Sequence, residues 1–284
     1  MTWRTPMASV LAAGMFAASA LGTAAAAADS PPIALSTSEG GTLPIAATEK
    51  VYAESADLYG EVARTGIALY ADLAATREPI RWRLAADGRT LFAMMQPEDA
   101  LYGKDAEVKL ADLTGDGLPE VLIYRNGIGS GGAQGLSVYR PADGWKPLLE
   151  LVDPRLKGSA GKDRYAVSYL GGGELAFEDK TTKLKGTIKL DVRRYDEDQA
   201  KSEAAFRKIE AWVDPVSGYG LGDDEGDGVL EITAVQRVIG VSHPDTIARI
   251  ETKYKLKDGA YVQVAETLCD AEGHPLQAVE IPGY

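Results

Sequence analysis

The residues of this chain best suited to chemistry are acids that recur at one spacing. Residues 112–120 read DLTGDGLPE and residues 223–231 read DDEGDGVLE, so a D-x-x-G-D-G-x-x-E loop occurs twice. Oxygen ligands at positions 1, 3, 5 and 9, with a backbone carbonyl at position 7, can surround a calcium ion when a glycine at position 6 permits the turn. Both loops have that glycine, so the sequence predicts two calcium sites.

The ligands expected at each site follow from these positions. The first loop offers Asp112, Thr114, Asp116, the Leu118 carbonyl and Glu120. The second loop offers Asp223, Glu225, Asp227, the Val229 carbonyl and Glu231. Thr114 is a hydroxyl where the second loop has a carboxylate, and Asp224 adds one more acid to the second loop. We therefore expect the second site to bind calcium more tightly.

The loops differ from EF-hands, which need a glutamate at position 12 between two helices. Position 12 is Ile123 in the first loop and Ala234 in the second, and both lie in apolar runs typical of strands. One alternative stays open at this point. Gly-Asp-Gly can be a tight turn that leads into a strand, because glycine adopts positive φ and aspartate accepts hydrogen bonds from the backbone nearby.

The N-terminus predicts export. Residues 1–28 carry one charge, Arg4, and an alanine-rich apolar run ends in small residues before Asp29. This pattern is typical of a secretory signal peptide. Residues 29–49 are rich in Ser, Thr, Pro, Gly and Ala and predict a flexible linker before a folded domain at 50–284. We expect a secreted or extracytoplasmic protein, in the periplasm or at the cell surface, with no integral membrane segment in the mature chain.

The charge of the chain argues against nucleic acid as a partner. Its formal net charge is −12, and no dense basic cluster offsets it, whereas phosphate backbones are bound by basic faces. An acidic exported protein is better suited to divalent cations. The single cysteine, Cys269, cannot form an internal disulfide, so stability must come from the apolar core and any bound metal.

Two repeated units are expected, at about 105–152 and 217–267. In each, the acidic loop leads to an apolar strand, a loop, a second strand and an Asp-Gly turn before a third strand. Between them we expect a hairpin over 164–177, a strand near 186–192 and a helix over about 197–212, packed on the sheet. The predicted fold is mainly β, with repeated antiparallel β units, propeller-like or a partial propeller, and one or two helices.

The Gly-Asp-Gly loops before strands resemble the FG-GAP or VCBS-type repeats of integrin-α-like proteins. The segment from Val213 to Gly240 is more closely similar to exported bacterial VCBS-repeat-containing proteins of largely uncharacterised role, and this resemblance spans about residues 105–265. It implies a calcium-associated β-repeat protein at the cell surface, with the acids of both loops in the family's cation positions. Only two such loops are present, which puts a complete seven-bladed ring in doubt.

Enzyme signatures are weak. The only histidines are His243 and His274, and neither has a catalytic or zinc-binding spacing with Cys269 or a serine. Residues 127–132 satisfy G-x-G-x-x-G, but a strand and not a helix is expected next, which argues against a dinucleotide site. Trp82, Trp145 and Trp212 could line a sugar-binding face, although aromatic residues in strands more often belong to the core.

These observations favour an exported, non-enzymatic, calcium-binding β-repeat protein that acts as a binding or adhesion-type module of the cell envelope. Its expected partner is an envelope protein or polysaccharide. The alternative from another class is an extracytoplasmic hydrolase, or a hydrolase accessory, that acts on wall or carbohydrate polymers and uses the loops at 127–135 and 240–245 as a cleft. A structural envelope protein with vestigial loops is the third possibility, and it predicts no response to metal.

Overall fold

The computed structural model describes residues 44–61, 63–97, 102–129, 131–151 and 164–282. The predicted signal peptide and most of the predicted linker lie outside these residues. The first strand begins at Ala47, so the last three residues of the predicted linker, 47–49, belong instead to a strand. Residues 47–49 pair with the end of the next strand, although their side chains are polar or small.

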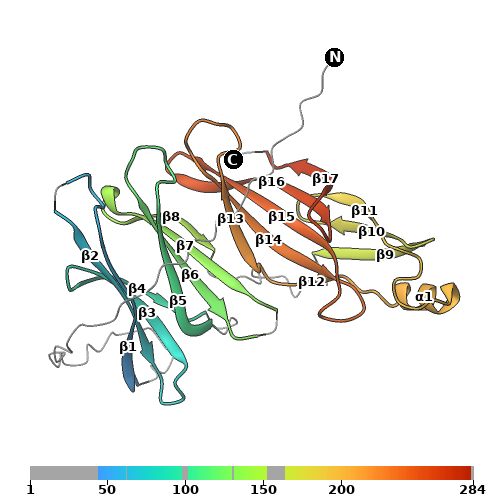
Figure 1. Cartoon of the computed structure of the whole chain (residues 1–284), viewed down its shortest axis with the longest axis horizontal. Helices are drawn as coiled ribbons and strands as arrows, with labels where there is room; N and C mark the ends of the chain where they lie inside the picture. The colour runs from blue at the N-terminus through green and yellow to red at the C-terminus, as the bar shows by residue number, and fades with distance from the viewer. Residues whose placement is uncertain (1–43, 62, 98–101, 130, 152–163, 283–284) are drawn as a thin grey trace, which may run out of the picture. The chain divides into compact units, whose positions relative to one another are not determined.

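The sheets are antiparallel and follow chain order (Figure 1). The first sheet contains β1 (Ala47–Ala56), β2 (Thr65–Leu73), β3 (Pro79–Ala86) and β4 (Arg89–Met95). The second contains β5 (Tyr102–Ala111), β6 (Glu120–Gly127), β7 (Gln134–Arg140) and β8 (Lys146–Leu151), with a 3-10 turn, η1 (Pro141–Asp143), before β8. Both are four-stranded meanders, in which each strand pairs with the next.

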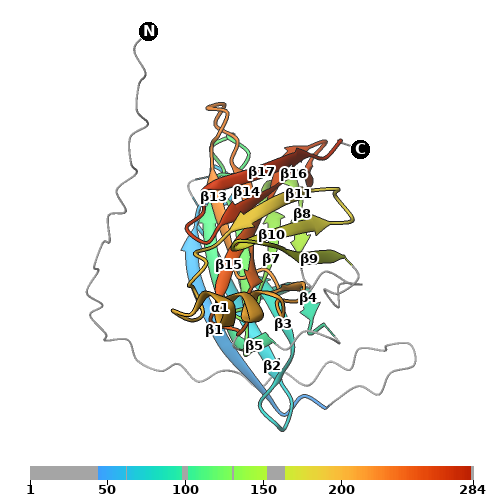
Figure 2. The same ribbon diagram turned by 90° about the vertical axis from the view of Figure 1, so that its right-hand side faces the viewer.

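Two further sheets follow. A three-stranded sheet contains β9 (Tyr165–Gly171), β10 (Glu174–Asp179) and β11 (Lys185–Lys189). The largest sheet has the order β12 (Trp212–Val213), β14 (Glu231–Ile239), β15 (Thr246–Lys257), β16 (Ala260–Asp270) and β17 (Pro275–Glu280), and β13 (Gly218–Gly222) also pairs with β14. Figure 2 shows these sheets from a second direction.

The prediction of a mainly β fold with repeated antiparallel units is confirmed, and α1 is the single α-helix of the described residues. The repeat has a simple structural form. In the first copy the acidic loop joins β5 to β6, and β7 and β8 follow; in the second it joins β13 to β14, and β15 and β16 follow. Each copy is therefore a four-stranded meander with the acidic loop between its first two strands.

The helix is shorter than predicted. It was expected over about 197–212, but α1 covers Gln199–Phe206, and Trp212 begins strand β12. Asp198 caps the N-terminus of α1 by accepting a hydrogen bond from Ala200 N at 2.9 Å. The predicted packing on a sheet is correct, because Phe206 and Ile209 are buried with side chains of β9, β10 and β15. Within the described part of the chain, no helix is long and apolar enough to cross a membrane.

Strand β6 explains how neighbouring sheets share a core. Six of its eight residues are buried, and its side chains alternate between two hydrophobic clusters. Val121 and Ile123 pack with the first sheet, whereas Leu122 and Tyr124 pack with residues of β14, β15 and β16. A strand covered on both faces is expected to be a continuous apolar run, as it is in the sequence. This core fixes the strands from which the acidic loops project.

Candidate metal centre

The two acidic loops adopt the same hydrogen-bond pattern. The carboxylate at position 1 accepts hydrogen bonds from the glycine amides at positions 4 and 6: Asp112 from Gly115 and Gly117, and Asp223 from Gly226 and Gly228. These four glycines have φ between 71° and 85°, a region that side chains other than glycine rarely adopt. The shared glycines of the motif are therefore explained by backbone conformation.

The remaining positions also correspond. At position 5, Asp116 accepts a hydrogen bond from Leu118 N and Asp227 from Val229 N, at 3.0 and 2.9 Å. At position 9, the glutamate accepts one from the amide at position 2, Glu120 from Leu113 at 2.7 Å and Glu231 from Asp224 at 2.8 Å. Both glutamates are almost fully buried, at 0% and 4% exposure. Each loop thus holds three carboxylates through its own backbone.

The loops also contact each other. Leu230 N donates a hydrogen bond to Leu113 O at 2.9 Å, and the Tyr261 hydroxyl donates to Leu230 O at 2.7 Å. A Cβ atom at Gly115 would lie only 2.8 Å from Gly228 O, so this glycine is also required by the close approach of the second loop. The acids of both copies consequently belong to one end of adjacent sheets.

A basic side chain reaches each loop from the neighbouring strand. The register pairs Val121 with Tyr139 and Ile232 with Tyr254, so Arg140 and Lys255 occupy equivalent positions one residue further on. Arg140 Nη2 lies 2.5 Å from Asp116 at position 5, and its Nε lies 3.8 Å from Glu120. Lys255 Nζ instead lies 2.5 Å from Glu225 at position 3.

The two loops therefore differ in which of their carboxylates is paired with a basic side chain. In the first loop a guanidinium already neutralises the position-5 carboxylate. In the second, no basic side chain of the described residues forms an ion pair with Asp223, Asp227 or Glu231; Lys253 pairs with Asp224, outside the predicted ligand set. The second loop therefore retains two carboxylates, Asp223 and Asp227, with no cationic partner in the described part of the chain, while Lys255 also attracts Glu231.

The pKa of Glu120 shows the strength of the local negative field. Burial raises the pKa of this carboxyl, the Leu113 amide and Arg140 lower it, and Asp116 and Asp112 raise it further. The net direction is upward. Carboxylates that raise one another's pKa in this way gain from a shared cation. In the first loop, Arg140 already supplies part of that positive charge.

In this conformation the side chains of the loops do not form a complete metal site. Among the described residues, no group of three or more His, Cys, Asp or Glu side chains is gathered at metal-binding distances. Thr114 lies toward Glu120, with its hydroxyl 3.4 Å from Oε1, and Glu225 faces Lys255. The predicted ligands share a preformed backbone, and their side chains would have to turn toward a common point to bind an ion.

The two loops of the hydrolase alternative also come together. A Cβ atom added at Gly131 would lie 3.8 Å from His243 Nε2. His243 Nε2 in turn lies 3.2 Å from Asp214 Oδ2. Asp214 is nearly buried and also accepts bonds from Arg237 and Trp212. This carboxylate holds neighbouring side chains in place, a role that needs no catalysis.

A buried carboxyl pair was missed by the sequence analysis. Asp179, Glu266 and Arg164 come from β10, β16 and the turn before β9, and both acids are fully buried. Arg164 Nη2 lies 2.6 Å from Asp179 Oδ2 and 3.3 Å from Glu266 Oε2. Burial and the Asp179 charge raise the pKa of Glu266 to about 8. Burial also acts to raise the pKa of Asp179, but Arg164 outweighs it and lowers that pKa.

Comparison with known proteins gives one family match. Residues 163–269 match the YybI C-terminal domain. The chain is also 28% identical over 173 residues to the "Uncharacterized protein YybI" of Bacillus subtilis (strain 168), an alignment that covers 60% of this chain and 64% of that protein. The chain thus spans less than two thirds of the length of this relative. The matched range includes the second acidic loop and the buried carboxyl pair.

One solved structure shows a faint likeness. It is described as the crystal structure of exotype rhamnogalacturonan lyase YesX, with 17% identity and a TM-score of 0.27, over 80% of this chain and 48% of that chain. A likeness at this level carries no argument about fold or activity. The resemblance to FG-GAP and VCBS repeats stays a prediction.

Proposed function

We propose that this chain is an exported, non-enzymatic β-repeat protein that binds calcium at its second acidic loop and acts as a binding module of the cell envelope. The observation that carries the proposal is the shared hydrogen-bond pattern of the two loops, combined with the carboxylates of the second that no basic side chain of the described residues pairs. Asp223, Asp227 and Glu231 supply three negative charges, and in the described residues Asp223 and Asp227 form no ion pair, while Lys255 attracts Glu231. Calcium is the cation that suits such a flexible all-oxygen set.

We propose that the first loop keeps its conformation without a bound metal ion. Arg140 supplies a positive charge to Asp116 and approaches Glu120. Its planar guanidinium lies near three carboxylates, those of Asp116, Glu120 and Asp143, whereas Lys255 is a flexible side chain paired with Glu225. A divalent ion in the second loop can displace Lys255 from Glu225 more easily than it can displace Arg140 from Asp116. The expectation that the second site is tighter thus gains a physical reason.

Calcium would act as a structural element in this proposal. The second loop joins β13 to β14, and the same loop touches the first through Leu230 and Gly228. Asp223, Asp227, Glu231 and the Val229 carbonyl would hold the ion, with Glu225 added when it leaves Lys255. An ion there would fix the junction of the two repeats and orient nearby loops for recognition.

Thermal unfolding tests the proposal. The full chain is expected to unfold about 5–10 °C higher with about 1 mM calcium than with excess chelator, which corresponds to a native-state site with a dissociation constant of about 10 μM. Asp227→Asn should reduce this shift, because it removes one negative charge from the second loop while keeping an oxygen ligand. Asp116→Asn, the matched change in the first loop, should leave it intact.

Control measurements distinguish calcium binding at the second loop from the alternatives. Magnesium at the same concentration should give a smaller shift, since it demands a more rigid geometry. Absence of any calcium shift in the wild-type chain would reduce the loops to turns and favour the inert structural alternative. Equal loss of the shift in both variants would contradict the assignment to the second loop.

A further inference from the structure

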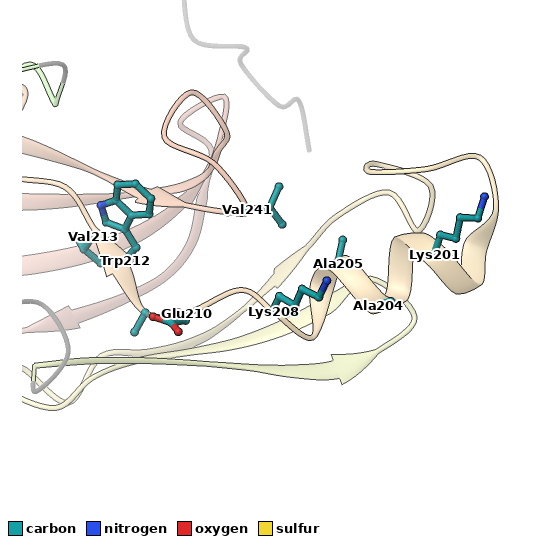
Figure 3. A pocket seen from close by; sticks show the side chains of 10 residues that line it. Lys201, Ala204, Ala205, Lys208, Glu210, Trp212, Val213 and Val241 are labelled. Carbon is teal, nitrogen blue, oxygen red and sulfur yellow. The ribbon is translucent and has the colours of Figure 1, made fainter.

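A cavity of about 850 Å³ lies between the end of α1 and the strand that follows it. One wall carries Lys201, Ala205 and Lys208, and the other carries Trp212, Val213 and Val241. Figure 3 shows Lys208 just after α1 on the side of Val241 and Trp212, and Lys201 further along the helix with its side chain directed away from them. The volume lies within the range of small-molecule binding sites, about 300–1,000 Å³.

Trp212 lines this cavity with a partly exposed indole ring, whose centroid lies 5.5 Å from that of the His243 ring. The Trp212 side chain is 44% exposed, while Trp82 is fully buried. The indole Nε1 donates a hydrogen bond to Asp214 Oδ1 at 3.1 Å, and Arg237 and His243 hold the other oxygen of Asp214. An exposed tryptophan locked in this way loses little conformational entropy when a ligand stacks on it. Core packing does not account for such an arrangement.

The charges of the cavity favour an anion. Lys201 and Lys208 are exposed and form no ion pair with another described residue, although the whole chain is strongly acidic. Glu210 also lines the cavity, and it has an interaction of its own. The remaining lining side chains are small or apolar. A ligand with an apolar face and one negative group would match both walls.

We infer that this cavity binds a sugar unit that carries a carboxylate, a uronic acid, as part of an envelope or extracellular glycan. The apolar face of the sugar ring would stack on Trp212 and contact Val213 and Val241, and the carboxylate would pair with Lys208. The cavity borders the C-terminal half of α1, at Ala204 and Ala205. Helix C-termini disfavour anions, so a singly charged carboxylate suits the site better than a doubly charged phosphate.

The inference rests on the proposed role as a binding module, but it does not depend on calcium. The residues of the cavity come from α1, β12 and the loop after β14, whereas the calcium proposal concerns the loop before β14. Failure of one proposal therefore leaves the other standing. A Trp212→Ala chain that still shows the calcium shift would demonstrate this independence directly.

Calorimetric titration of the full chain with a tetramer of β-1,4-linked glucuronate tests the inference. Binding should weaken at least tenfold in Trp212→Ala and severalfold in Lys208→Gln, while Trp212→Phe should retain most of it. Lys189→Gln, which removes an exposed lysine of β11, should bind as the wild type does. The β-1,4-linked glucose tetramer, which lacks only the carboxylates, should bind at least tenfold more weakly.

Four outcomes would overturn the inference. No binding of the glucuronate tetramer, or binding that Trp212→Ala does not change, would remove the cavity as a uronate site. Equal binding of the glucose tetramer would show a neutral sugar site and contradict the role of the lysines. Inorganic phosphate that competes with the glucuronate tetramer at lower concentration than glucuronic acid would assign the site to phosphate.

Discussion

Replacing Arg164 with methionine is expected to lower the free energy of unfolding by about 3–5 kcal/mol, the usual cost of leaving a buried charge without its partner. The Arg164 guanidinium makes two contacts with Asp179 Oδ2, from Nε at 2.7 Å and from Nη2 at 2.6 Å. Asp179 is fully buried, so without Arg164 its carboxylate must either stay charged in the core or take up a proton. Urea unfolding at pH 7 measures the loss.

Two companion variants make this result specific. Arg77→Met removes an arginine that is 76% exposed and pairs with Glu49, and it should cost at most about 1 kcal/mol, as exposed ion pairs do. Asp179→Asn in the Arg164→Met background should recover part of the lost stability, because it removes the orphaned charge. A loss below about 1 kcal/mol for Arg164→Met would contradict the buried ion pair.

Stability should also fall as pH rises from about 5 to 8, because of Glu266. Its folded pKa is raised to about 8 from an ordinary value of 4.5, so between these values the folded chain holds a proton that the unfolded chain releases. The stabilisation is fully present below pH 4.5 and is lost as pH rises toward 8, by at most about 1.4 kcal/mol per pH unit. Glu266 Oε1 lacks a hydrogen-bond partner in the described residues, which a neutral carboxyl tolerates better.

Glu266→Gln isolates this contribution, since glutamine keeps the shape and stays neutral. Urea unfolding of both chains at pH 5.5, 7 and 8.5 should show the variant gaining on the wild type as pH rises, by roughly 3 kcal/mol over the whole window. Other titrating groups affect both chains alike, so the difference reports on Glu266. Parallel pH profiles would mean that Glu266 ionises normally in the folded chain.

The parts of the fold that the sequence predicted are those set by neighbouring residues. The acidic loops, the Asp-Gly turns and the hairpin at 164–177 depend on glycine conformations and short apolar runs, and these are visible in the sequence. The predicted helix was too long for a related reason. Ala204, Ala205 and Ile209 continue the helical spacing, but Ile209 packs into the core beyond the last turn and Trp212 pairs with Ile239 in a strand.

The features that the sequence did not reveal depend on contacts between distant strands. Arg164 and Glu266 are 102 residues apart, and no local pattern connects them. Arg140 reaches Asp116 because β7 pairs with β6 in one particular register. The fixed orientation of Trp212 depends on Arg237 and His243, which hold Asp214 from β14 and the loop that follows it. These sites could be found only once the register of the strands was known.

Calcium titration of the chelator-treated full chain by calorimetry tests the central claim most directly, because it counts ions. We expect one calcium ion bound per chain, with its affinity retained in Asp116→Asn and clearly weakened in Asp227→Asn. Two ions per chain, or one ion that is lost in Asp116→Asn and kept in Asp227→Asn, would contradict the assignment to the second loop. No measurable calcium binding by the wild-type chain would contradict the proposed function itself.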